Sequence, residues 1–161
     1  MMEASMPDYK KLLDSIAKKD SVKDKETPQI VQRFFLPGID SWCPGEVTTE
    51  WIVDEMLLGP TGLFGGYIAM VSDTMAAHAT YSMMNDNEWM ATKSIKVDFK
   101  RPIRDGKIIA YAKATRVGDS ISIEVQYSRS DGEIAYIAIV EQLVRSTKNS
   151  GVDRHQWNLS G

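Results

Sequence analysis

The stretch Tyr67–Met84, YIAMVSDTMAAHATYSMM, decides the fold class. It contains no glycine or proline, is rich in alanine and methionine, and is long enough for about five helical turns. Apolar residues lie on nearly every side of such a helix, which is typical of a helix that is buried rather than lying at a surface. We therefore expect a long central helix that the rest of the domain covers.

Segments with the pattern of β-strands lie on both sides of this helix in the sequence. Before it, Val47–Val53 is rich in β-branched residues and follows Pro44-Gly45. After it, turn signals such as Gly118-Asp119 and Asp131-Gly132 separate four further segments. These are residues 91–100, 107–117, 120–128 and 134–144. We expect an α+β fold, in which a curved antiparallel sheet of about five strands wraps the helix and the last four strands form a meander.

The first of these four segments alternates regularly between apolar and polar residues. The alternation predicts one face with Ile95, Val97 and Phe99, and an opposite face with Thr92, Ser94, Lys96 and Asp98.

The two ends of the chain differ from the middle in composition. Residues 1–30 predict a loosely packed N-terminal appendage, with a short amphipathic helix over Pro7–Lys19 and a charged linker. Residues 31–145 form the predicted domain, and residues 146–161 a flexible polar tail.

Length and composition exclude several classes of protein. With 161 residues, 43% hydrophobic and 25% charged, the chain is a single globular domain rather than a disordered one. Its one cysteine, Cys43 in a predicted loop, excludes an intrachain disulfide and a zinc cluster. The net charge of -3 argues against nucleic acid as a partner. No stretch resembles a membrane span or a signal peptide, so we expect a cytoplasmic protein without a membrane partner.

Four motifs follow one another between Gly45 and Arg145. They are Leu63-Phe64-Gly65-Gly66, then Asp73, then TKSIKVDFKRP over residues 92–102, then the Gly-Asp and Asp-Gly turns that separate the last three strands. In this order they resemble the hotdog-fold thioesterases, specifically the phenylacetate-pathway type that acts on acyl-CoA. That family has Leu-His-Gly-Gly at the start of its central helix and a strand ending in Phe-x-Arg-Pro.

The resemblance implies hydrolysis of an acyl-CoA thioester to the free acid and CoA. Asp73 would act as general base or as nucleophile, the Gly66 N–H would stabilise the oxyanion, and Thr92 would reach the site of a neighbouring subunit. It also implies a homodimer or homotetramer, with sheets joined edge to edge and sites at the subunit boundary. No cofactor or metal is expected, since CoA is part of the substrate.

Each of these residues also has a simpler structural interpretation. A carboxylate such as Asp73 in an apolar helix is costly to bury, but it can face solvent or pair with a lysine or arginine. Gly65 and Gly66 offer free N–H groups at a helix N-terminus, yet two glycines can merely permit a sharp turn. Thr92 can be an ordinary strand threonine.

Six cations lie within fifteen residues, from Lys93 to Lys107. Among them, Lys93, Arg101 and Arg104 are candidates for binding the phosphates of CoA, and the alternative is a solvated strand face.

Two residues depart from the family pattern and make the entrance to the predicted site more apolar. Phe64 stands where the family has histidine, and Leu58 where it has asparagine or glutamine. With Gly65, they are expected to contact substrate, and they favour either a bulkier acyl group or a non-catalytic protein that binds acyl-CoA or lipid. His78 follows Asp73 by five residues, about 140° further around the helix, which argues against a histidine-dependent dehydratase.

Overall fold

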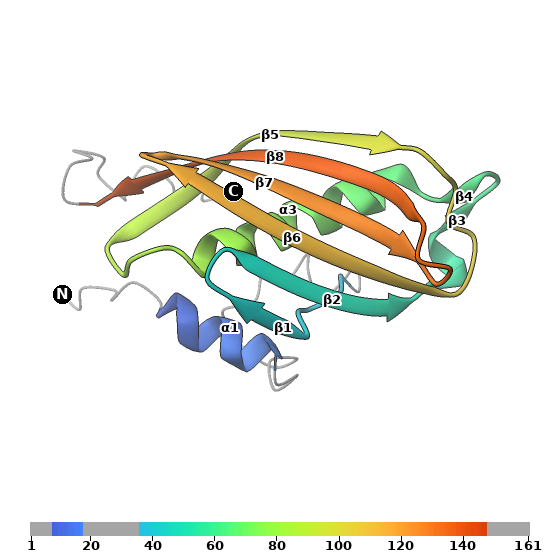
Figure 1. The fold of residues 1–161 in the computed structure, drawn as a ribbon, viewed down its shortest axis with the longest axis horizontal. Coiled ribbons are helices and arrows are strands. Elements are labelled where there is room, and N and C mark those ends of the chain that lie inside the picture. Colours follow the sequence, from blue (N-terminus) through green and yellow to red (C-terminus); the bar gives the residue numbers. More distant parts are fainter. Residues whose placement is uncertain (1–7, 18–35, 148–161) are drawn as a thin grey trace, which may run out of the picture.

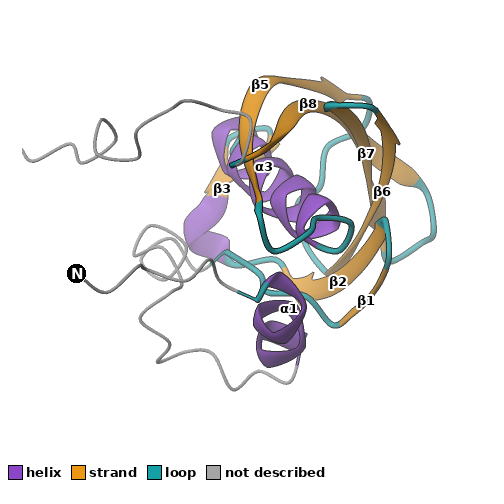
Figure 2. Cartoon of the chain, turned by 90° about the vertical axis from the view of Figure 1, so that its left-hand side faces the viewer, coloured by secondary structure: helices purple, strands orange, loops and turns teal. Residues whose placement is uncertain are grey.

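The computed structural model describes residues 8–17 and 36–147, and in it one long helix lies inside a curved sheet (Figures 1 and 2). The helices are α1 (Tyr9–Ala17) and α3 (Gly65–Tyr81), with a short 3₁₀ turn over Glu55–Leu57. The strands are β1 (Ser41–Cys43), β2 (Glu46–Ile52), β3 (Leu58–Gly59), β4 (Gly62–Leu63), β5 (Glu88–Phe99), β6 (Lys107–Val117), β7 (Ser120–Arg129) and β8 (Ile134–Ser146). This confirms the predicted α+β hotdog architecture.

The main sheet has six antiparallel strands in the order β1-β2-β6-β7-β8-β5, and β3 and β4 form a separate small hairpin. The expected meander of four strands is wrong in one respect, because β5 pairs with β8 and not with β6. The sixth strand is β1, which the sequence analysis took for a loop containing Cys43. Pro44 and Gly45 form the turn between β1 and β2, and Gly45 has a φ of 83°.

A bulge in β5 changes which residues face the helix. Thr92 pairs with Gln142 and Ser94 with Glu141, so Lys93 is an extra residue without a partner in β8. Thr92 therefore lies on the same inner face as Ile95, whereas strict alternation places these two side chains on opposite faces. The predicted assignment of Thr92 to the polar face is thus wrong.

Helix α3 supplies the centre of the hydrophobic core. Ile68, Val71 and Ala76 are fully buried against the inner face of the sheet, as expected for a helix without a marked polar side. His78 is also buried, and none of the described residues forms a hydrogen bond with its Nδ1 atom. Burial lowers the pKa of His78 from 6.5 to about 4, so the side chain is neutral.

Helix α1 packs tightly on the domain, and the expectation of a loose appendage is wrong for these residues. Leu13 is fully buried, Tyr9 stacks on Tyr81 with ring centroids 4.8 Å apart, and Trp42 donates a 2.9 Å hydrogen bond to Asp14. The rest of the predicted appendage and nearly all of the predicted tail lie outside the described residues.

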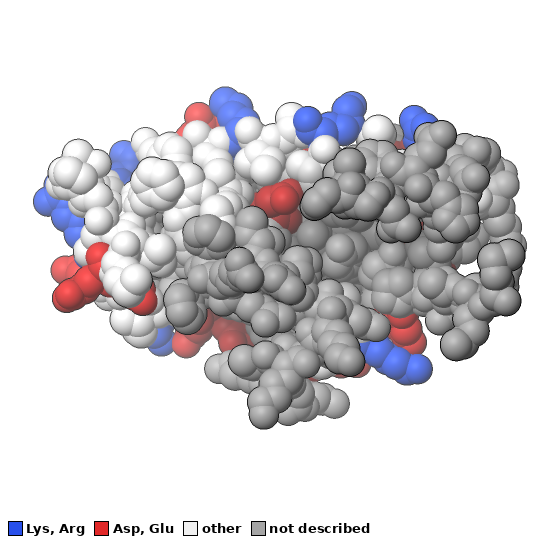
Figure 3. Space-filling model, turned by 180° about the vertical axis from the view of Figure 1, so that it is seen from behind, with Lys and Arg blue, Asp and Glu red and all other residues white. Residues whose placement is uncertain are grey.

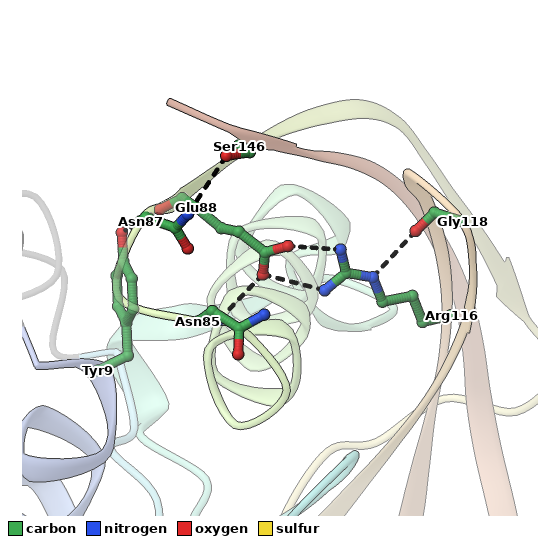
Figure 4. A network of polar contacts seen from close by, with 7 residues as sticks. All are labelled: Tyr9, Asn85, Asn87, Glu88, Arg116, Gly118 and Ser146. Atoms are coloured by element: carbon green, nitrogen blue, oxygen red, sulfur yellow. Dashed lines mark hydrogen bonds and ion pairs between the residues drawn. The ribbon is translucent and has the colours of Figure 1, made fainter. Parts of the chain in front are cut away.

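An ion pair links β5 to β6 at the end of the sheet next to α1 (Figure 4). Arg116 meets the Glu88 carboxylate with both terminal nitrogens, at 2.7 and 3.0 Å, and its Nε donates to the Gly118 carbonyl. The Tyr9 hydroxyl donates to the Glu88 carbonyl at 3.1 Å, so the same residue ties α1 to β5. The arginine holds the pKa of Glu88 below its usual value.

Candidate active site

One stripe of α3 is not covered by the sheet. Gly66 is exposed, and Met70, Asp73 and Ala77 are half-buried, at spacings that place them on one side of the helix. The inner face of β5 lies beside this stripe, since Phe99 approaches Gly65 and Thr92 contacts Asp73. Asp73 therefore lies at an accessible position between a helix and an edge strand, in largely apolar surroundings.

Thr92 holds the carboxylate of Asp73. Its hydroxyl donates to Asp73 Oδ1 at 2.8 Å, which brings together two residues that the sequence analysis selected. The contact is within one chain, because the bulge at Lys93 turns Thr92 toward its own helix. The expectation that Thr92 reaches the site of a neighbouring subunit stays a prediction. Within the described part of the chain, no lysine or arginine forms an ion pair with Asp73.

Two buried polar residues that the sequence analysis missed extend this contact inward. Gln142 donates from Nε2 to Thr92 Oγ1 at 3.2 Å, and Thr80 donates from Oγ1 to Gln142 Oε1 at 2.5 Å. Both Gln142 and Thr80 are fully buried. The available signal was a glutamine in the row of alternate residues Ala138, Val140, Gln142 and Val144, which is otherwise apolar.

The start of α3 forms the second polar element of the site. Among the described residues, neither the Gly65 nor the Gly66 N–H donates a hydrogen bond, as expected for the first turn of a helix. A Cβ at Gly66 would lie 2.7 Å from the Phe64 ring, and one at Gly65 3.1 Å from the Phe99 ring. Because glycine has no Cβ, the rings of Phe64 and Phe99 can lie close to the free N–H groups.

The residues predicted around this turn do lie together. Leu58 of β3 pairs with Leu63 of β4, and the Phe64 N–H donates to the Leu57 carbonyl at 2.9 Å. The small hairpin thus places the Phe64 ring over the helix start, where the ring is 66% exposed. Leu58 is half-buried against the core.

The cations selected from the sequence are separated by the fold. Lys93 lies at the bulge beside Thr92, whereas Arg101 and Arg104 follow the far end of β5. Arg101 pairs with Glu133 at 3.6 Å and lines an open surface cavity of about 550 Å³. Basic side chains lie along the top edge of Figure 3, the edge that β5 occupies in Figure 1.

The sequence was compared with models of protein families and with curated proteins. The sequence profile described as thioesterase superfamily matches residues 62–135, the segment from the hairpin before α3 into β8. The match covers 74 of the 161 residues, so this central part of the chain is similar to the thioesterase superfamily. None of the curated proteins compared with it matches in sequence.

Solved structures of thioesterases share the fold of this chain. A mutant thioesterase from Pseudomonas aeruginosa is 17% identical, with a TM-score of 0.67 over 91% of this chain and 99% of that chain. A phenylacetic acid degradation-related protein from Ralstonia eutropha, described there as a possible thioesterase, is 16% identical, with a TM-score of 0.66 over 80% and 98%. A hypothetical thioesterase from Streptococcus pneumoniae, crystallised with coenzyme A, is 15% identical, with a TM-score of 0.60 over 67% and 84%.

Two further observations concern metal ligands and membrane spans. Within residues 8–17 and 36–147, no three histidine, cysteine or acidic side chains are grouped as metal ligands. No helix in these ranges is both long and apolar enough to cross a membrane.

Proposed function

We propose that the protein hydrolyses the thioester bond of an acyl-CoA, as the phenylacetate-pathway type of hotdog thioesterase does. The observation that carries the proposal is the Asp73 carboxylate, held by Thr92 on the open stripe of an otherwise apolar helix. The similarity of residues 62–135 to the thioesterase superfamily and the coenzyme A in the Streptococcus pneumoniae neighbour support this class of substrate. The lysines of β5 offer charge for the CoA phosphates.

The carboxylate has two possible roles in the reaction. As a general base, Asp73 takes a proton from water, whose oxygen attacks the thioester carbon; the C–S bond then breaks and CoA leaves as its thiolate. As a nucleophile, Asp73 attacks the carbon directly, and water then hydrolyses the resulting anhydride. In ¹⁸O-labelled water, label found in Asp73 after a single turnover establishes the nucleophilic route with water attacking the aspartyl carbon of the anhydride, because the general-base route puts the label only in the acid product.

A second copy of the chain completes the site in this proposal. Gly66 and Asp73 are seven residues apart on α3, a rise of about 10 Å, and the free N–H groups point away from Asp73. A carbonyl bound at the Gly66 N–H of one chain therefore lies far from that chain's own carboxylate. Strand β5 forms one edge of the sheet, and a long exposed edge strand is suited to pairing with another copy.

The activity is tested by following thiol release from short, long and aromatic acyl-CoAs. Asp73→Asn is expected to lower kcat/KM at least about tenfold. Asp98→Asn is the matched control, since Asp98 pairs with Lys96 at 3.2 Å on the outer face of β5. Equal turnover by wild type and Asp73→Asn would reject Asp73 as the reacting group.

The shared site is tested by mixing two inactive variants. Asp73→Asn keeps a normal helix start, and Gly66→Pro keeps the carboxylate but removes the N–H. Random mixing is expected to restore roughly a quarter of the wild-type rate, since half of the dimers carry one complete site. No recovery, with both variants folded by circular dichroism and exchanging subunits, would contradict a site shared between two chains.

Phe64 favours a second candidate function, the non-catalytic binding of acyl-CoA or lipid. Its ring packs against Gly66, beside the N–H groups that an oxyanion would use. Binding of acyl-CoA without turnover on any substrate would establish this alternative.

A further inference from the structure

Gln142 is a fully buried polar side chain in an apolar row. On the inner face of β8 its neighbours Ala138, Val140 and Val144 are all fully buried and apolar. An amide in such a place is costly unless its hydrogen bonds are made. Gln142 makes them with Thr80 on α3 and Thr92 on β5, so it links the core to the residue that holds Asp73.

The Asp73 carboxylate fixes the direction of every hydrogen bond in the series that joins Asp73, Thr92, Gln142 and Thr80. A carboxylate only accepts, so the single hydroxyl hydrogen of Thr92 goes to Asp73. The Thr92 oxygen must then accept from Gln142, which presents Nε2 to it and Oε1 to Thr80. Thr80 must in turn donate. One arrangement satisfies all four residues, and it leaves the Thr92 hydroxyl no competing acceptor among the described residues.

The hydroxyl of Thr80 departs from the behaviour of its neighbours on α3. Ser72 and Thr74 donate to carbonyls one turn earlier in their own helix, at 2.7 and 3.1 Å. Thr80 instead gives its hydrogen to Gln142 at 2.5 Å, across the core. Helix α3 thus contributes to both ends of the chain of hydrogen bonds, through Thr80 and through Asp73.

We propose that Gln142 is a positioning residue for the reaction, anchored by Thr80 and acting through Thr92 on Asp73. This rests on the proposed function. By accepting nothing from Thr92, the Gln142 amide directs that hydroxyl onto Asp73 Oδ1 and holds the carboxylate in one orientation. The Oδ2 atom, which accepts no hydrogen bond from the described residues, is left for water or for the thioester carbon.

A double-mutant cycle tests the proposal through kcat and KM. Gln142→Leu and Thr92→Val are each expected to lower kcat roughly tenfold, with KM changed less than about twofold, because each interrupts the series of hydrogen bonds that orients the Asp73 carboxylate. The double variant is expected to be no slower than Thr92→Val alone. Effects that multiply in the double variant would overturn the proposal, since they mean that Gln142 acts independently of Thr92.

The matched control for these variants is Ser122→Ala. Ser122 donates to Glu141, the residue before Gln142, but on the exposed outer face of the sheet. It removes a hydrogen bond to β8 without touching the inner chain, so kcat is expected to stay at the wild-type value.

An NMR measurement decides the inference even where no thioester is turned over. The side-chain amide of Gln142 is followed by hydrogen exchange in wild type and in Thr92→Val, a change at an exposed residue. We expect exchange to accelerate at least about fivefold in the variant, because Nε2 loses its acceptor. An unchanged amide signal and rate would refute the link between Gln142 and Thr92. A wild type that lacks turnover would refute only the proposed function.

Discussion

Protonation of His78 is expected to make the protein less stable in mild acid. The side chain is buried in α3 without a partner for Nδ1, and burial lowers its pKa to about 4. Between pH 6.5 and 4 the unfolded chain therefore binds more protons than the folded one, so the free energy of unfolding falls as the pH falls. The full difference corresponds to about 3 kcal/mol, of which about 2 kcal/mol is lost by pH 5.

Urea denaturation at pH 7.5, 6 and 5 measures this loss. The matched variant is His78→Leu, which keeps a buried apolar side chain and has no group that titrates. It is expected to be at least as stable as wild type at pH 7.5, because it removes an unpaired buried nitrogen, and to lose little stability by pH 5. If His78→Leu loses the same 2 kcal/mol as wild type, His78 is not the group that is held neutral by burial.

Three further changes test the packing around the site. Arg116→Met leaves the Glu88 carboxylate without its cation and is expected to lower the free energy of unfolding in urea by about 3 kcal/mol. Since the pKa of Glu88 is lowered in the fold, chiefly by Arg116, wild type is expected to lose this stabilisation as the pH falls below the usual glutamate range, and Arg116→Met to lose less there, because the Asn85 N–H still donates to the carboxylate. Gly62→Ala brings a Cβ within 2.8 Å of the Ile103 carbonyl oxygen at a φ of 133°, and a thermal melt is expected to show a loss of roughly 2 kcal/mol or more. Tyr9→Phe keeps the ring and removes the hydrogen bond to the Glu88 carbonyl, so a loss of about 1 kcal/mol in urea is expected, and a loss of 3 kcal/mol would contradict the assignment.

Much of the fold follows from patterns that are local in the sequence. The central helix was predictable because 67–84 lacks helix breakers, and β6, β7 and β8 because tight turns separate them. The pairing of β5 with β8 was not, because the 34 residues between Phe99 and Ile134 carry no local signal for it. Strand β1 is only three residues long, too short for periodicity to reveal.

The candidate site was predictable only in part, for a different reason. The motifs select Asp73, Gly66 and Thr92, and the structure puts Thr92 on Asp73. The bulge at Lys93 that brings them together has no marker such as glycine or proline, so regular alternation assigned Thr92 to the wrong face. Gln142 was hidden because its importance comes from partners on two other elements.

The place of β8 in the sheet has a consequence for how the chain folds. Strand β5 is synthesised before β6, β7 and β8, but among the described strands it pairs only with β8. It therefore stays unpaired until β6 and β7 have been synthesised and paired and β8 has followed. Contacts between such distant segments form slowly, and an unpaired strand that carries Ile95, Val97 and Phe99 is prone to aggregate meanwhile. Lys93 and Lys96 reduce that danger during synthesis, since charge opposes stray edge-to-edge association. A chain cut before residue 134 would keep the carboxylate and the threonine but lack the strand that brings them into register.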